Sequence, residues 1–302
     1  MSDRLLKFMF RGAPVRGEFV RVADAWREMT AHHQYPAPVK RLLGEMVAAA
    51  ALLASNIKFN GALVMQVHGD GPIKLLVVEC QPDLCLRATA KFSDHGIAAG
   101  ATMRELINRS GRGRFAITLD PRDPRPGQQP YQGIVPLDGE SMADVLETYM
   151  RQSEQLETRL VLAADDEVSA GLLLQRLPET GGTPGAIDED AWDRVKLLGA
   201  TLSVDELVRL SPENLARRLY SQEVLEHQAT LSPRFACRCS RERIGRMLVS
   251  LGREEVDSII AELTNVTVTC DFCGRQYSFD AVDVAQLFTS GETLEADDRQ
   301  RH

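Results

Sequence analysis

The sequence has no excess of positive charge and no stripe of aromatic and basic residues. Lysine and arginine total 35 against 43 aspartate and glutamate, which gives a formal net charge of -8 at pH 7 and a pI near 5.4. Nonspecific binding to nucleic acid depends on clustered cations. This balance therefore argues against nucleic acid as a partner.

Long hydrophobic runs are also missing. The longest, Met46 to Ala54, is far shorter than the roughly 20 apolar residues that span a bilayer. The segment from Met1 to Gly12 carries several charges and lacks the apolar core and small-residue cleavage site of a secretory signal. We therefore expect a soluble, cytoplasmic protein with no membrane partner.

Motifs of common enzymes are absent as well. The sequence contains no Gly-x-Ser-x-Gly elbow, no His-Glu-x-x-His pair and no Walker pattern. Gly69-Asp70-Gly71 resembles part of a phosphate loop, but it lies between two strand-like runs and is typical of a hairpin turn. We expect neither an enzyme nor a nucleotide-binding protein.

The first half of the chain mixes helix and strand patterns. Apolar residues recur at spacings of three and four from Pro38 to Ile57, which predicts a buried helix, and a second helix is expected from Ser141. The strand-like runs do not alternate regularly with helices, which favours an α+β domain with a largely antiparallel sheet. These runs cover residues 62–67, 73–80, 84–90, 114–119, 131–135, 157–163 and 168–177.

A turn-rich stretch, Pro178 to Gly185, predicts a domain boundary. Residues 188–231 then have a helical pattern, with an acidic surface and an apolar stripe that must be buried against something because helices this short are marginal unless packed. We expect a core domain at 1–177, a metastable helical linker at 178–232, a small C-terminal domain at 233–289 and a disordered tail at 290–302.

Four cysteines form the strongest chemical signal. Cys237-Arg238-Cys239 is followed, after 30 residues, by Cys270-Asp271-Phe272-Cys273-Gly274. Two close pairs of thiols are typical of a tetrahedral zinc site, and the glycine permits the turn of the second pair. We predict that Cys237, Cys239, Cys270 and Cys273 bind one Zn²⁺, and that four protein ligands leave no position for catalysis.

Such a site can be purely structural or can respond to oxidants. The Cys-x-Cys pair is tighter than usual, and Arg234, Arg238, Arg241 and Arg243 surround it; positive charge and metal both favour the oxidisable thiolate. Structural zinc supplies about 10 to 16 kcal/mol of apparent folding free energy to small modules, so oxidation would unfold this one. Cys80 and Cys85 lie outside the cluster and are interpreted as small buried residues without a role.

The sequence resembles the heat shock protein 33 family, the redox-regulated 33-kDa chaperonins of bacteria. The four-cysteine pattern carries the resemblance, together with FMFRGAPVRGEFVRV from Phe8, YPAPVKRLLGEMVAAAALL from Tyr35 and GALVMQVHGDGPIKLLVVEC from Gly61.

The resemblance implies an ATP-independent holdase that is inactive when reduced and zinc-bound. Oxidation would form the disulfides Cys237 with Cys239 and Cys270 with Cys273, release zinc, loosen the linker, and accompany homodimerisation and the binding of unfolding client proteins.

Two other classes of function remain open at this point. A zinc-ribbon adaptor for nucleic acid or protein is compatible with the cysteine spacing but not with the acidic balance. An oxidoreductase acting through Cys270-x-x-Cys273 would need a thioredoxin-like βαβ context, which the pattern does not contain. The identity of clients, their binding surface, the dimer interface, the oxidant threshold and any role of Cys80 and Cys85 are not encoded in a readable motif.

Overall fold

The computed structural model describes residues 3–93, 95–124, 129–178 and 190–289. The chain divides into two compact units, residues 1–236 and 237–302, each described here by itself. The expected disordered tail at 290–302, and most of the turn-rich stretch at 178–185, lie outside the described residues. Within these ranges no helix is both long and apolar enough to cross a membrane.

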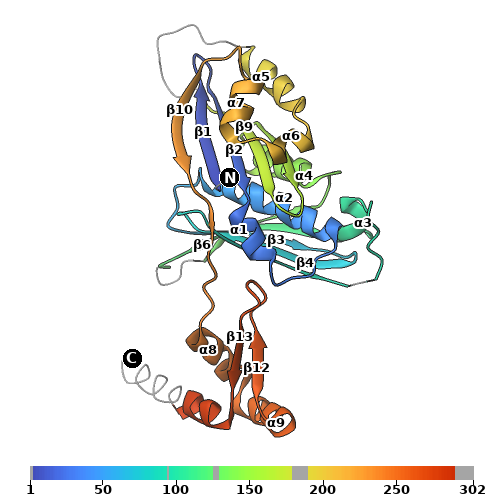
Figure 1. The fold of residues 1–302 in the computed structure, drawn as a ribbon, viewed down its shortest axis with the longest axis vertical. Coiled ribbons are helices and arrows are strands. Elements are labelled where there is room, and N and C mark those ends of the chain that lie inside the picture. The colour runs from blue at the N-terminus through green and yellow to red at the C-terminus, as the bar shows by residue number, and fades with distance from the viewer. Residues whose placement is uncertain (1–2, 94, 125–128, 179–189, 290–302) are drawn as a thin grey trace. The chain divides into compact units, whose positions relative to one another are not determined.

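Unit 1 contains two sheets (Figure 1). The first has the strand order β10-β1-β2-β9-β8, and all its neighbours are antiparallel. Its strands are β1 (Arg4–Phe10), β2 (Val15–Val22), β8 (Thr158–Ala164), β9 (Ser169–Arg176) and β10 (Leu225–Leu231).

The second sheet has the order β11-β5-β4-β3-β6-β7, and only the short pairing of β11 with β5 is parallel. Its strands are β3 (Gly61–His68), β4 (Ile73–Cys80), β5 (Cys85–Phe92), β6 (Arg114–Pro121), β7 (Tyr131–Pro136) and β11 (Arg234–Phe235).

The buried helix α2 (Ala37–Ala54) packs against strands of both sheets. Its alanine-rich centre, with Gly44 against the side chain of Ala164, lets the helix approach the first sheet closely. A large core forms around α2, and three shorter helices flank it. These are α1 (Asp24–Thr30), α3 (Met103–Ile107) and α4 (Met142–Ser153), the last two with capping boxes at Thr102 and Ser141.

Three short helices pack against strands of the first sheet and form a second core with it. They are α5 (Ala191–Ala200), α6 (Val204–Arg209) and α7 (Pro212–Leu219). Tyr220, directly after α7, contacts the rings of Phe8, Phe10 and Phe19 from the sheet. The apolar stripe expected in this segment is therefore buried, as predicted, and we call α5 to α7 the helical layer.

The structure confirms the α+β fold with largely antiparallel sheets, the helix α2 and the strands β3 to β9. One expectation is wrong. The helical pattern was extended to residue 231, but Leu225–Leu231 is the strand β10, paired antiparallel with β1. The exposed edge of β1 offers backbone N–H and C=O groups, which form hydrogen bonds with this segment when it is a strand. A helix would leave these groups without partners.

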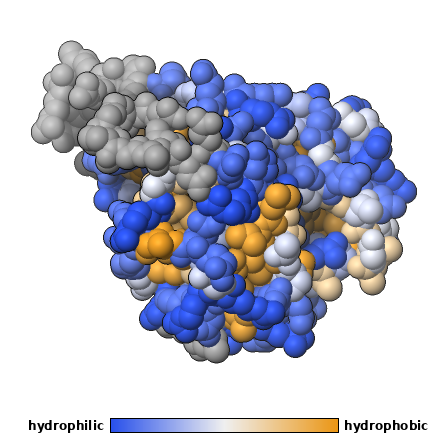
Figure 2. All heavy atoms as spheres, turned by 90° about the horizontal axis from the view of Figure 1, so that it is seen from above, coloured by the Kyte–Doolittle hydropathy of each residue, from blue (hydrophilic) through white to orange (hydrophobic). Residues whose placement is uncertain are grey.

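Not all apolar side chains of the helical layer face its core. Leu197 and Val204 are 67% and 60% exposed. Figure 2 shows one face of the molecule, on which hydrophobic side chains form separate groups between hydrophilic ones. Apolar side chains scattered in this way are common on protein surfaces and do not by themselves mark a contact site.

Unit 2 is small and contains helices α8 (Arg241–Leu251) and α9 (Arg253–Leu263) and the hairpin of β12 (Val266–Thr269) and β13 (Gln276–Phe279). Residues 281–289 are also helical. Ser240 caps α8 by accepting a hydrogen bond from the backbone of Arg243, and Gly252, with φ +96°, ends it. The core has seven buried side chains: Leu248, Val256, Val266, Tyr277, Phe279, Val284 and Phe288.

Candidate metal centre

The Sγ atoms of Cys237, Cys239, Cys270 and Cys273 all lie within 4.8 Å of one another. Two contacts join the sequence pairs: the Sγ atoms are 3.6 Å apart for Cys237 and Cys270, and 3.4 Å apart for Cys239 and Cys273. Cys270 is buried and the other three are half-buried. The structure thus brings together the four cysteines that the sequence singled out.

The second pair is positioned by the turn between β12 and β13. The backbone N–H of Cys270 donates to the carbonyl of Arg275, and that of Gly274 donates to the carbonyl of Cys270, each at 2.9 Å. Gly274 has φ +67°, a conformation that favours glycine because it has no Cβ. The turn therefore points both sulfurs to the same side.

The first pair lies in an extended segment directly before α8. Cys239 also packs against the core of unit 2, and its Sγ accepts a hydrogen bond of 3.1 Å from the hydroxyl of Tyr277. Because Ser240 fixes the start of α8, the position of Cys239 depends on the helix and on β13 together.

The cluster fits a tetrahedral metal ion with thiolate ligands. Zinc–sulfur bonds of about 2.3 Å give a sulfur–sulfur edge of about 3.8 Å in a regular tetrahedron. The separations of 3.6 and 3.4 Å lie just below that edge, and the upper bound of 4.8 Å lies above it. Four soft ligands in this arrangement could hold a metal ion, and sulfur donors favour zinc over hard cations.

The pKa values of Cys237 and Cys239 shift in opposite directions. Burial raises the pKa of Cys237. Burial also acts to raise the pKa of Cys239, but hydrogen bonds from Tyr277 and the neighbouring thiols outweigh it and lower the pKa to about 7. Cys239 is therefore the thiol that these contacts favour as an anion near neutral pH.

Arg275 interacts with the cluster but was not identified from the sequence. A hydrogen bond with Tyr277 raises the pKa of Arg275, and electrostatic attraction to Cys239 and Cys273 raises it further. Arg241, one of the four arginines expected to surround the first pair, instead forms an ion pair of 2.7 Å with Asp283 and lies over the ring of Phe279. Arg275 lies two residues after Cys273. A search for basic residues near the second cysteine pair, and not only near the first, could have found it.

Arg234, another of those arginines, belongs to unit 1 and forms an ion pair of 2.5 Å with Asp83. Cys80 and Cys85 also lie in unit 1. Cys80 is fully buried, and burial raises the pKa of its thiol. Cys85 is half-buried and its thiol contacts the carboxylate of Asp83 at 3.4 Å. Neither cysteine belongs to the four-sulfur cluster.

Comparison with known proteins relates nearly the whole chain to one family. The model of the Hsp33 protein family matches residues 3–280. The 33 kDa chaperonin of Methylobacillus flagellatus is 45% identical over 299 residues, covering 99% of this chain and 98% of that protein. The 33 kDa chaperonin of Chromobacterium violaceum is 46% identical over 288 residues, covering 95% and 94%.

A solved structure has the same fold. The crystal structure of the 33 kDa chaperonin (heat shock protein 33 homolog) from Thermotoga maritima at 2.20 Å resolution matches with a TM-score of 0.79. The match covers 97% of this chain and 100% of that one at 19% sequence identity. The shared architecture therefore persists where most side chains differ.

Proposed function

The chain belongs to the Hsp33 family, and on that premise we propose that it is a redox-regulated holdase chaperone that works without ATP. In the reduced, inactive state Cys237, Cys239, Cys270 and Cys273 hold one zinc ion. Oxidation to the disulfides Cys237 with Cys239 and Cys270 with Cys273 releases the metal. The oxidised chain forms a homodimer and binds unfolding client proteins, which keeps them from aggregating.

The observation that carries this proposal is the cluster of four thiols in a unit with a core of seven buried side chains. A domain this small rarely folds on its core alone, so a structural metal contributes much of its stability. Each disulfide forms as two cysteine thiolates give two electrons to hydrogen peroxide, which takes up two protons from the solvent and is reduced to two water molecules. Disulfide sulfurs are poor ligands for zinc, so oxidation both removes the metal and destabilises unit 2.

The helical layer is the element that we propose to loosen. Its helices have 10, 6 and 8 residues, lengths that are unstable without packing. From α7 the chain continues through β10 and β11 directly into Cys237. Unfolding of unit 2 therefore frees one end of this connection, and separation of the layer would expose the apolar side chains that now pack on Phe8, Phe10 and Phe19.

A reducing compartment is required for such a switch, because the resting state has free thiols. We therefore assign the protein to the cytoplasm. The proposed mechanism uses neither nucleotide, nucleic acid nor membrane, and it involves no catalytic turnover. Exposed apolar surface binds clients without sequence specificity, and the net charge of -8 keeps the complexes in solution.

The proposal is tested by light scattering of a thermally unfolding client protein. We expect the zinc-loaded, reduced chain to leave aggregation unchanged, and the peroxide-treated chain to suppress it at near-equimolar ratio with or without ATP. A Cys80→Ser variant is the matched control and should behave like the wild type. Equal suppression by reduced and oxidised protein would contradict redox regulation.

The pairing of the disulfides needs a separate measurement. In the reduced structure sulfurs of different sequence pairs also lie close together, at 3.6 and 3.4 Å, so proximity alone does not select the proposed pairing. Peptide mapping by mass spectrometry of the oxidised chain should recover Cys237 linked to Cys239 and Cys270 linked to Cys273. Recovery of Cys237 with Cys270 as the main product would overturn this part of the mechanism.

A further inference from the structure

Unit 1 contains a cavity of about 290 Å³ that no cysteine lines. It lies where the end of α2, strands of both sheets and the end of α4 meet. Most of its wall is aliphatic and comes from elements that also build the large core. The side chains that form the deep part are Leu53, Ile57, Leu63, Ile117, Leu119 and Leu173.

Among the described residues, one cation lines this apolar space. Arg16 on β2 is half-buried, and its Nε donates to the amide oxygen of Gln175 at 2.9 Å. Gln175 is fully buried and its Nε2 donates to Thr158 at 2.8 Å, which fixes the direction of the amide. Burial removes part of the hydration of this guanidinium, and the carboxylate of Glu18, which also pairs with Lys7, attracts it. The hydrogen-bond acceptor at the cavity itself is the neutral amide oxygen of Gln175, and a carboxylate would be a stronger one.

The acidic side chain at the cavity lies on its solvent side. Glu154 is exposed and accepts a hydrogen bond of 3.2 Å from the hydroxyl of buried Tyr149. Tyr131, 53% exposed, also lines the cavity. Charge at an exposed site is screened by water more than charge at a buried one. The buried part of the cavity is therefore apolar with a positive end.

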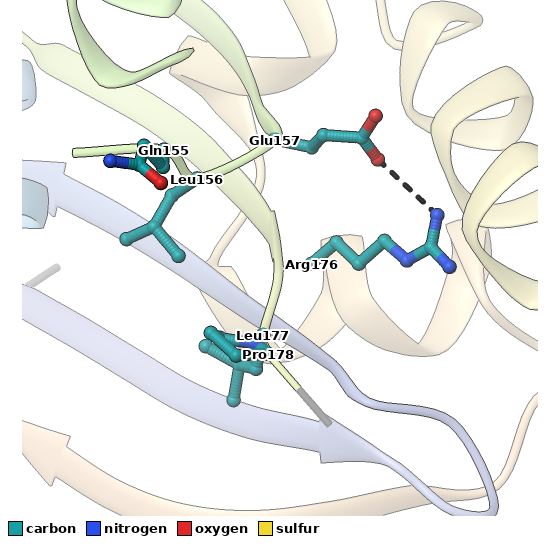
Figure 3. Close-up of a pocket in the computed structure, with 6 residues that line it drawn as sticks. All are labelled: Gln155, Leu156, Glu157, Arg176, Leu177 and Pro178. Carbon is teal, nitrogen blue, oxygen red and sulfur yellow. Dashed lines mark hydrogen bonds and ion pairs between the residues drawn. The ribbon is translucent and has the colours of Figure 1, made fainter. Parts of the chain in front are cut away.

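The cavity has a shallow neighbour. Figure 3 shows an open hollow at the start of β8 and the end of β9, lined by Gln155, Leu156, Glu157, Arg176, Leu177 and Pro178. Glu157 and Arg176 form an ion pair of 3.5 Å there. Leu156 lines both the hollow and the cavity. The side chain of Leu156 is thus a wall that the hollow and the cavity share.

We propose that this cavity binds one monoanionic amphiphile, a medium-chain fatty carboxylate, with its carboxylate on Arg16 and its chain among Leu53, Leu63 and Ile117. The size is consistent with this class, since an engineered cavity of about 150 Å³ holds benzene. A volume near twice that accommodates a chain of roughly eight to ten carbons. One cation matches one negative charge, which favours a carboxylate over a dianionic phosphate.

The test uses calorimetric titration of the full-length, zinc-loaded, reduced chain with three ligands of equal length: decanoate, decanol and decylamine. Concentrations are kept below those at which the ligands aggregate. We expect decanoate to bind with a stoichiometry of one per chain and at least tenfold more tightly than decylamine. Equal affinity for decanoate and decylamine, or uptake that does not saturate near one, would overturn the proposal.

Two variants locate the site. Arg16→Gln should weaken decanoate binding at least tenfold and leave decanol binding unchanged, whereas Ile117→Trp should block both by filling the cavity. Arg11→Gln is the matched control, because Arg11 is an exposed arginine paired with Glu226. Thermal unfolding of each variant verifies the fold, and Arg16→Lys retains the charge should Arg16→Gln fail to fold. Undiminished decanoate binding by folded Arg16→Gln would refute the assignment.

Discussion

Each of the four cysteines of unit 2 contributes one sulfur to a single cluster. Removing one sulfur should therefore affect the whole site. We expect Cys237→Ser and Cys273→Ser each to weaken zinc binding by about 100- to 1,000-fold, since losing a quarter of about 10 to 16 kcal/mol of binding free energy removes roughly 2.5 to 4 kcal/mol. Cys80→Ser is the control and should leave the affinity unchanged. Competition with a chromophoric chelator measures all three, and equal losses would refute the ligand assignment.

Tyr277 was not identified from the sequence, because an aromatic residue on a strand is usually a core residue. It is one here, but its hydroxyl also donates to the Sγ of Cys239. Partners of metal ligands orient them and typically change metal affinity by about 10- to 100-fold. Tyr277→Phe keeps the ring and removes the donor, so zinc affinity should fall about tenfold in the same competition assay. The far-UV circular dichroism should stay that of the wild type, and Tyr131→Phe should change neither.

Glu45 gives unit 1 a pH dependence. Burial raises the pKa of this carboxyl from its ordinary 4.5 to about 7, against the opposing effect of Arg41. The folded state then binds more protons than the unfolded state between these values, so stability falls as pH rises from about 4.5 to 7 and changes no further from this source above it.

The Glu45→Gln variant removes this titration. Relative to the wild type it should be more stable at pH 8, by roughly 2 to 3 kcal/mol, and should show no such gain at pH 4.5. Urea unfolding at the two pH values tests this, with exposed Glu28→Gln as the control. A gain of the same size at both pH values would exclude titration as the cause.

At the scale of elements, sequence patterns predicted those with clear periodicity. The helix α2 and the strands β3 to β9 follow from apolar spacing and turn residues. The strands β1 and β2 were not predicted, because charged residues interrupt their apolar positions. Lys7 and Glu18 form an ion pair of 3.3 Å between them, with the side chain of Glu18 fully buried. A pair formed across strands is not visible as a pattern along either one.

The strand β10 shows the same limit. Its residues carry no strong strand signal, and its side chains are mostly exposed or half-buried. Pairing with β1, and an ion pair of 2.8 Å between Arg11 and Glu226, hold it in place. Tertiary context decides the conformation of such a segment, which overrides its local preference.

The helical layer allows a direct test of the proposed loosening. Leu207 in α6 is fully buried in the core between the layer and the first sheet. Leu207→Ala should destabilise the layer by about 2 to 5 kcal/mol. Hydrogen exchange in residues 191–219 should accelerate, and the reduced protein should gain part of the aggregation-suppressing activity. Leu197→Ala, at a 67% exposed position of α5, is the matched control. Faster exchange without any gain in activity would separate the layer from client binding.

At the scale of the whole molecule, the sequence predicted that the four cysteines lie together and that the fold is α+β. It did not predict how the middle of the chain is packed. Two closely spaced pairs of cysteines are a metal-binding pattern that is visible in the sequence. The cluster of Cys237, Cys239, Cys270 and Cys273 could therefore be recognised without a structure. The apolar stripe of residues 191–219 indicated burial, yet its partner is a sheet whose central strands, β1 and β2, had not been recognised. The structure therefore places the helical layer within unit 1.

The measurement that tests the account most directly records zinc release and client aggregation in the same sample during peroxide treatment with mild heating. A colorimetric chelator reports the metal, and light scattering reports the client. We predict that zinc leaves as the four thiols are lost, and that suppression of aggregation rises with it. Retention of zinc in a fully active chaperone, or activity before any thiol is oxidised, would contradict the switch and leave the cysteine cluster as a structural site.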